Sequence, residues 1–286
     1  MKMKVLLHVN YYEGAGKLDT LFDLAKINGC DGVELRQIYR FPDMDQLHYQ
    51  DKVESLKQKY PEMEITFGCM VDFTGGTAEE VKQQSDVLFD FMDWASCKCG
   101  TPVMNMFTGP MIRKDVDYTE FQLNGSGMAT EEHYQKAAQG LRMVGDKAAS
   151  LRMLMALETH NGYLHDLAKP CKKLMEMTAH ESIGINYDHG NIILNSNGES
   201  IADVFPLLEG KIYYAHLKNL LTFKNSYQVT HLDAGYIDTM EVVSGLRNNL
   251  KSGMLAIEYP CPGDGIIAAR RDMEYMRFIK NWLKIS

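Results

Sequence analysis

Short apolar runs alternate with longer amphipathic segments along the whole chain. Each run has the length of a buried strand, and each segment that follows has the spacing of a helix. Eight such pairs can be counted, with predicted strands at 4–9, 31–36, 65–71, 102–107, 153–157, 183–187, 212–215 and 254–257. Because buried strands that alternate with helices pair in parallel, eight pairs in a chain of this length predict a closed (β/α)₈ TIM barrel.

The number of domains follows from the same pattern. A chain of 286 residues suits one large α/β domain or two ordinary ones. No shift in composition marks a linker, so we predict a single domain over residues 1–286. An open doubly wound sheet is the alternative, but it normally carries a glycine fingerprint after its first strand. The stretch from Asn10 to Gly16 imitates that fingerprint only weakly.

Helix ends can also be located. Thr77 and Glu80 form a predicted capping box at the start of a helix that ends before Gly100. Pro170 falls in the first turns of a predicted helix over 166–178, where proline is tolerated.

The longest connection between predicted elements runs from Thr108 to Ala129. It contains glycine turns at Gly109 and Gly125-Ser126-Gly127 and shows little periodicity. Connections of this length inside a compact domain are usually functional or disordered. We interpret this one as a lid over the open face of the barrel, with a mobile excursion as the alternative.

Consecutive predicted strands end in residues that can bind a metal. These residues are Glu158, Asp188, His216 and Glu258. In a parallel barrel the carboxyl ends of all the strands open onto one face, where active sites lie. One such acid or histidine is usually solvated or packed, but a succession of them predicts a shared site. Carboxylates with one imidazole and no cysteine favour Mn²⁺ or Mg²⁺, with Co²⁺ and Zn²⁺ as alternatives. A cation would also relieve the repulsion between converging acids.

Charge and cysteine usage exclude several classes of protein. A formal charge of −8 disfavours a nucleic-acid partner, which needs a clustered basic face. The six cysteines form no Cys-x-x-Cys pair. The first residues lack a signal-peptide core, and no apolar stretch approaches the length of a membrane span. We therefore expect a soluble, reduced, cytoplasmic protein without a membrane partner.

The strand ends resemble those of the xylose-isomerase-like TIM barrel superfamily of sugar isomerases and epimerases. The resemblance covers nearly the whole chain and is most specific from Glu158 to Glu258. Its motifs are Asp31-Gly32-Val33-Glu34-Leu35, Leu157-Glu158-Thr159-His160-Asn161-Gly162, Asp188-His189-Gly190-Asn191, Ala215-His216-Leu217-Lys218-Asn219, Leu255-Ala256-Ile257-Glu258 and the turn 233–238. It implies one divalent metal held by Glu158, Asp188, His216 and Glu258, with Glu158 and Glu258 also serving as acid and base.

The implied activity is a metal-dependent sugar isomerase or epimerase in carbohydrate metabolism. Such an enzyme moves a proton on a ketose or a polyol-derived ketone through a metal-bound enediolate. Five further residues are candidates for holding substrate hydroxyls or for supporting the ligands from behind: Glu34, His160, His189, Asn191 and Lys218. His189 could equally be a packing residue beside Asp188.

Several alternatives stay open. A dehydratase acting on a keto-inositol needs the same metal and base. The abasic-site endonucleases of this superfamily (AP endonuclease family 2) use three metals and several further histidines. In this chain the third and fourth strands end near Gly68 and Asn105 without a histidine, and Asn191 stands where the nuclease pattern has one. A barrel that only binds a sugar has no need of the opposed Glu158 and Glu258. No Arg/Lys cluster beside a glycine turn marks a phosphate site, which favours unphosphorylated sugars. Homo-oligomers are common among such barrels, but no stripe identifies an interface.

Overall fold

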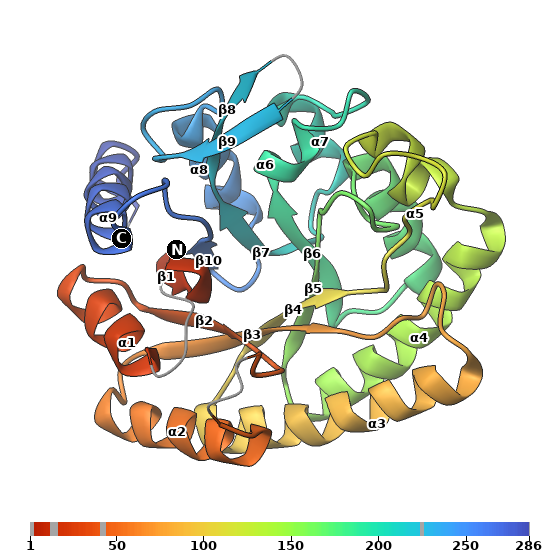
Figure 1. Ribbon diagram of the computed structural model, residues 1–286, viewed down its shortest axis with the longest axis horizontal. Helices are drawn as coiled ribbons and strands as arrows, with labels where there is room; N and C mark the ends of the chain where they lie inside the picture. The colour runs from red at the N-terminus through yellow and green to blue at the C-terminus, as the bar shows by residue number, and fades with distance from the viewer. Residues whose placement is uncertain (1–2, 12–16, 41–43, 224–225, 286) are drawn as a thin grey trace.

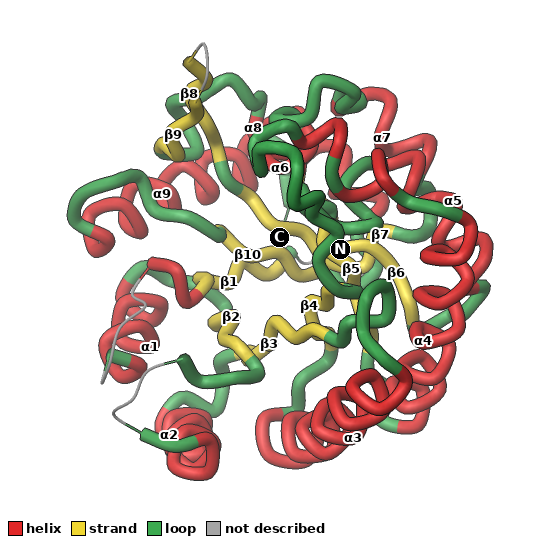
Figure 2. Tube along the Cα trace, turned by 45° about the vertical axis from the view of Figure 1, so that its right-hand side comes forward, coloured by secondary structure: helices red, strands yellow, loops and turns green. Residues whose placement is uncertain are grey.

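The computed structural model describes residues 3–11, 17–40, 44–223 and 226–285, and within them eight parallel strands close into a barrel. Figures 1 and 2 show the strands at the centre and the helices around them. The order around the barrel is β1-β10-β7-β6-β5-β4-β3-β2. The strands are β1 Lys4–His8, β2 Gly32–Arg36, β3 Glu64–Met70, β4 Val103–Phe107, β5 Leu154–Glu158, β6 Ile183–Asp188, β7 Ile212–Leu217 and β10 Met254–Ile257. The predicted barrel is confirmed.

The helices lie on the outside and bury their apolar faces against the strands. They are α1 Leu18–Ile27, α2 Gln46–Lys59, α3 Ala78–Trp94, α4 Glu131–Ser150, α5 Ala168–Thr178, α7 Ile201–Leu207, α8 Thr239–Asn249 and α9 Gly265–Trp282. The capping box of Thr77 and Glu80 is present at the start of α3. A π-helical turn, Ala95–Cys99, continues α3 until Gly100 ends it with φ of 66°. None of the described helices is long and apolar enough to cross a membrane.

The barrel interior changes from apolar to polar along the strand direction. Ala156, Tyr214 and Ala256 belong to a small apolar cluster inside the barrel. Side chains of a strand alternate between its two faces, so the residue two positions further along points to the same interior. Those positions are Glu158, His216 and Glu258. Strand alternation therefore directs the predicted ligands inward at the carboxyl ends of their strands.

Elements between the main strands and helices were not predicted. An antiparallel hairpin, β8 Asn219–Phe223 and β9 Ser226–Thr230, follows β7 and rises at the edge of the barrel mouth (Figure 1). A one-turn helix, α6 His189–Ile192, follows β6 directly. Two short 3₁₀ helices, η3 Phe121–Leu123 and η4 Gly125–Met128, lie in the long connection between β4 and α4.

The long connection between β4 and α4 is fastened to the segment that follows β5. The Met111 N–H donates to the Gly162 carbonyl at 2.7 Å, and the Ser126 N–H donates to Asp166 Oδ2 at 3.1 Å. Gly125 has a left-handed φ of 53°, and a Cβ there would lie 2.4 Å from Asp166 Oδ2. Glycine is therefore needed at this close approach. The connection borders the mouth of the barrel, and its role as a lid stays a prediction.

Candidate metal centre

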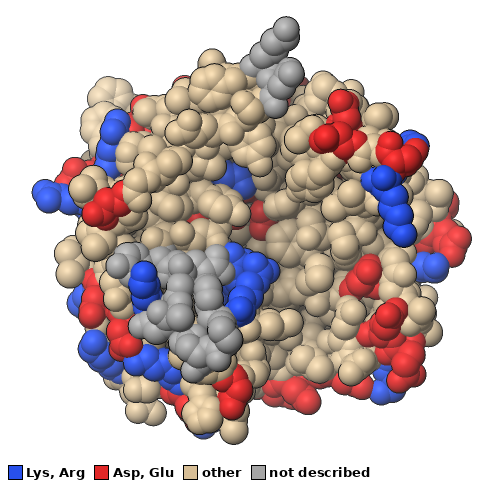
Figure 3. All heavy atoms as spheres, in the orientation of Figure 1, with Lys and Arg blue, Asp and Glu red and all other residues tan. Residues whose placement is uncertain are grey.

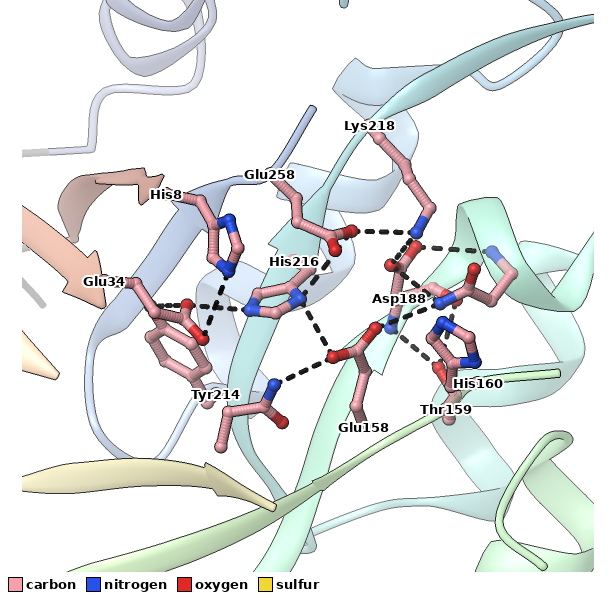
Figure 4. A network of polar contacts seen from close by, with 12 residues as sticks. His8, Glu34, Glu158, Thr159, His160, Asp188, Tyr214, His216, Lys218 and Glu258 are labelled. Atoms are coloured by element: carbon pink, nitrogen blue, oxygen red, sulfur yellow. Dashed lines mark hydrogen bonds and ion pairs between the residues drawn. The ribbon is translucent and has the colours of Figure 1, made fainter. Parts of the chain in front are cut away.

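Four side chains from consecutive parallel strands of the barrel meet at its carboxyl end (Figure 4). Glu158 ends β5, Asp188 ends β6, His216 lies near the end of β7, and Glu258 follows β10. One ligand atom from each residue lies within 4.8 Å of the others, and all four residues are buried. The structure thus brings together the residues that the strand-end pattern placed in one site.

His216 is held from behind by a residue on the other side of the barrel. Its Nε2 donates to Glu34 Oε2 at 2.8 Å, and the Tyr214 hydroxyl donates to the same oxygen at 2.8 Å. The other ring nitrogen, Nδ1, faces Glu158 Oε2 at 3.3 Å and Glu258 Oε2 at 3.8 Å. This Nδ1 is buried and has no hydrogen-bond partner. A histidine whose one nitrogen is fixed by a carboxylate presents the other as a metal ligand.

Two asparagine side chains orient the acids. Asn105 Nδ2 donates to Glu158 Oε2 at 2.8 Å. Asn191 Nδ2 lies between two acids, 3.1 Å from Glu158 Oε1 and 3.0 Å from Asp188 Oδ2. The backbone N–H of Asp188 donates to the Thr159 hydroxyl at 2.8 Å, which joins the ends of β5 and β6. The carboxylates are therefore held in fixed positions before any ligand binds.

Lys218 bridges the remaining oxygens of the cluster. Its Nζ lies 2.6 Å from Asp188 Oδ2 and 2.8 Å from Glu258 Oε2. Gly190 makes room for this side chain, because a Cβ there would lie 2.5 Å from Lys218 Cγ. Burial alone would lower the pKa of Lys218, but attraction to Asp188 and Glu258 outweighs burial and holds the pKa well above its usual range. Lys218 is therefore a charged donor rather than a base.

Burial and charge compete at the other titratable groups. Burial raises the pKa of Asp188 to about 7, against the attraction of Lys218. Burial would also raise the pKa of Glu158, but the attraction of His216 outweighs it and lowers that pKa. Burial would lower the pKa of His216, and the attraction of Glu34 and Glu158 raises it instead. Acidic groups outnumber basic ones in this buried cluster, which is the electrostatic condition that a bound cation relieves.

The other predicted site residues lie in different positions. Glu34, Asn191 and Lys218 contact the four residues directly. His160 lines the cavity above the cluster, and its Nδ1 lies 2.8 Å from the Asn161 carbonyl oxygen. The ring of His189 lies 5.9 Å from that of Tyr187, and burial lowers the pKa of His189 to about 4. Among the described residues, no hydrogen bond or ion pair joins His189 to the cluster.

The structure adds Asn105, Tyr214 and Thr159, whose contacts the sequence did not reveal. The only available signal was a polar residue inside an apolar strand, such as Asn105 between Met104 and Met106. Such a residue indicates a polar barrel interior, but it does not say which strand end it contacts.

A divalent cation fits the donor set at the centre of the cluster. The ligand atoms are carboxylate oxygens and one imidazole nitrogen, which suit Mg²⁺, Mn²⁺, Co²⁺ or Zn²⁺. The buried Nδ1 of His216 lacks a hydrogen-bond partner and faces two of these carboxylates. Glu158, Asp188, His216 and Glu258 are the residues that could hold the ion.

Comparison with known proteins gives partial matches to curated enzymes and full-length matches to solved structures. The inosose dehydratase of Lacticaseibacillus casei is 25% identical over 138 residues, which are 48% of this chain and 41% of the relative. The matched part therefore spans less than half of the curated relative. The structure of L-ribulose 3-epimerase has a TM-score of 0.74 and 14% identity, covering 99% of this chain and 96% of that one.

A second similar structure is that of a protein with bound zinc. The IOLI protein with a binding zinc atom has a TM-score of 0.73 and 16% identity, covering 98% of both chains. At these identities the structural matches show a shared fold. The sequence profile of the family described as "Xylose isomerase-like TIM barrel" matches residues 22–280 of this chain. The chain therefore belongs to the xylose isomerase-like TIM barrel family.

Proposed function

We propose that the protein is a divalent-metal-dependent isomerase or epimerase that moves a carbon-bound proton on a ketose or polyol-derived ketone. The observation that carries the proposal is the convergence of Glu158, Asp188, His216 and Glu258 within 4.8 Å. A divalent cation at this position would supply a Lewis acid that holds neighbouring substrate oxygens and stabilises the charge developed on deprotonation.

The proposal assigns the roles of base and acid to two glutamates. Glu158 and Glu258 come from strands separated by β6 and β7 in the barrel order, so they approach the centre from different sides. Amide donors from Asn105 and Asn191 bind the Glu158 oxygens and favour its ionised form, which can accept a proton. Lys218 donates to Glu258 Oε2 at 2.8 Å and fixes that carboxyl group. One glutamate would remove the proton and the other would return one.

The test begins with a metal analysis of protein prepared without chelator, compared with His216→Ala. About one ion per chain in the wild type and much less in the variant is the expected result. Equal metal content would remove His216 from the site. The loaded enzyme is then incubated with a panel of ketoses in deuterated water. Deuterium at a carbon beside the carbonyl supports the proposal, and no exchange with any ketose would contradict it.

A dehydratase acting on a keto-inositol is the second candidate. The partial likeness to curated inosose dehydratases favours it. Such an enzyme removes the same kind of proton, after which a hydroxyl on the next carbon leaves as water. The charged Lys218, 2.8 Å from Glu258 Oε2, could donate to that hydroxyl. Mass spectrometry distinguishes the candidates, because a dehydratase product is lighter by one water and an isomerase product is not.

A further inference from the structure

A cavity of about 510 Å³ opens above the metal-binding residues, and its two ends differ in charge. Four charged residues line it: the buried Glu158 and Glu258 form its inner end, and the half-buried Arg36 and the exposed Arg40 form its outer wall. Figure 3 shows the hollow in the middle of this face, with charged side chains inside it and further basic side chains beside it. We propose that the cavity takes a substrate with an anionic group, a carboxylate or a phosphate, which Arg36 and Arg40 bind. This inference rests on the proposed function.

Arg36 is fixed at the mouth of the barrel by its position at the end of β2. Its Nη2 donates to Asn10 Oδ1 at 2.6 Å, and its carbonyl accepts from the Tyr49 hydroxyl at 2.7 Å. A guanidinium presents several N–H donors in one plane. This planar group matches the paired oxygens of a carboxylate or phosphate.

Arg40 lines the same cavity, as does Tyr163. Burial raises the pKa of Tyr163, and the positive charge of Arg40 acts against that rise. Arg40 is exposed, and no hydrogen bond or ion pair found among the described residues engages its guanidinium. Its charge is thus available to a ligand in a protein whose net charge is −8.

Gln84 adds donors to this wall. Its Oε1 accepts from the Asp72 N–H at 2.7 Å, so its amide N–H groups are the part left for the cavity. The acidic residues that line the cavity are Glu158 and Glu258, both at the inner end beside the proposed cation. A neutral sugar would have no need of two guanidinium groups at the outer wall. An anionic group would be matched by them.

Binding at two points also serves the proposed reaction. With its anionic group at the outer wall and its carbonyl end at the metal-binding residues, a substrate can enter in one direction only. This orientation of the substrate would keep the reacting carbon between Glu158 and Glu258. The sequence expectation of an unphosphorylated sugar rested on the lack of a basic cluster beside a glycine turn. Here the arginines come instead from the end of β2 and the loop after it.

The experiment compares matched neutral and anionic ketoses on the metal-loaded enzyme. The probes are a ketopentose, its 5-phosphate ester and a keto sugar acid of the same chain length. Deuterium exchange gives kcat and KM, and calorimetry gives Kd without turnover. We expect one anionic probe to exceed the neutral ketose by about tenfold to hundredfold in kcat/KM and in affinity, as charge-assisted hydrogen bonds supply. The anionic probe with the higher kcat/KM and affinity shows whether the cavity takes a phosphate or a carboxylate.

Variants assign the preference to the arginine wall. Arg40→Gln should remove most of the preference through KM and Kd, and Arg40→Lys should retain part of it because the charge remains. Arg270→Gln is the matched control, since Arg270 is exposed on α9 and pairs with Glu274. Equal affinity for neutral and anionic probes, or equal effects of Arg40→Gln and Arg270→Gln, would overturn the anion site. Anion binding that depends on Arg40 without deuterium exchange would confirm the site and overturn the proposed function instead.

Discussion

Glu34 Oε2 accepts a hydrogen bond of 2.8 Å from His216 Nε2, and neither side chain is accessible to solvent. Glu34 comes from β2 and His216 from β7, so the bond crosses the barrel interior. Because a carboxylate only accepts hydrogen bonds, the contact requires a proton on Nε2, and Nδ1 is then the ring nitrogen that could bind a metal. Glu34 therefore orients the His216 ring within the candidate metal centre.

Replacing this carboxylate should weaken metal binding. Glu34→Gln can turn its amide N–H group towards His216 and loses the negative charge behind the ring. We expect metal affinity to fall by about 10–100-fold, the range found for the supporting partners of metal-bound histidines. Titration of the metal-free protein with Mn²⁺ and Zn²⁺ measures the change. Glu62→Gln serves as control, because Glu62 is exposed and pairs with Lys26. Equal affinities for the two variants would contradict the role of Glu34.

Lys218 and the metal should substitute for each other in stabilising the fold. Lys218→Met leaves Asp188 and Glu258 buried without their ammonium partner, which costs about 3–5 kcal/mol when one member of a buried pair is removed. A bound cation would neutralise the same carboxylates. Lys218→Met should therefore lower Tm more in metal-free protein than in metal-loaded protein. Lys82→Met, at an exposed site, is the control. An equal loss of Tm in both states would refute the coupling.

Asp166 should make stability depend on pH. It is buried, its Oδ1 has no hydrogen-bond partner, and burial raises its pKa from 3.8 to about 7. Between these values the native state holds the proton that the unfolded state has lost. Asp166 therefore contributes stability below about pH 4 that is lost as pH rises to about 7, at most about 4 kcal/mol at 1.4 kcal/mol per pKa unit.

The variant Asp166→Asn lacks the titrating group and keeps an oxygen that can accept from the Ser126 N–H. Melting curves of both proteins at pH 4.5, 5.5, 6.5 and 7.5 give the comparison. The Tm difference, variant minus wild type, should increase across this range. A difference that does not change with pH would show that Asp166 does not titrate there.

The long connection from Thr108 to Ala129 should be protected from proteolysis when substrate binds. Arg113 and Lys114 are exposed and offer trypsin sites. On the same segment, burial raises the pKa of Tyr118, and the positive charge of Lys218 acts against that rise. Trypsin digestion with and without a ketose that exchanges deuterium measures protection, and cleavage at Lys251 serves as reference. Cleavage after Arg113 and Lys114 that ignores the ligand would count against a lid.

The barrel and the convergence of the four candidate metal ligands could be predicted because both depend on short-range patterns. Alternation of apolar runs with helical segments indicates parallel strands. Side chains two positions apart on a strand share a face, so Glu158 points to the same interior as Ala156, and Glu258 to the same interior as Ala256. The capping box at Thr77 is equally local. Each of these features needs only a few neighbouring residues.

Contacts across the barrel could not be predicted in the same way. The bond from Glu34 to His216 depends on where β2 and β7 lie in the closed barrel, although their residues are 182 positions apart. The contacts of Lys218 depend likewise on the placement of Asp188 beside Glu258. The hairpin β8–β9 could not be predicted because only the first two residues of β8 are buried, which leaves too short an apolar run to indicate a strand.

Solvent exchange by the two glutamate variants tests the central claim most directly. Glu158→Gln and Glu258→Gln keep the size and one oxygen of each side chain but remove the proton acceptor. Both are loaded with metal, and occupancy is measured in the same samples that are incubated with the ketose in deuterated water. We predict that deuterium incorporation falls by about 10²–10⁴-fold in each variant at full metal occupancy. Incorporation at the wild-type rate by the metal-loaded variants would contradict the assignment of Glu158 and Glu258 as acid and base.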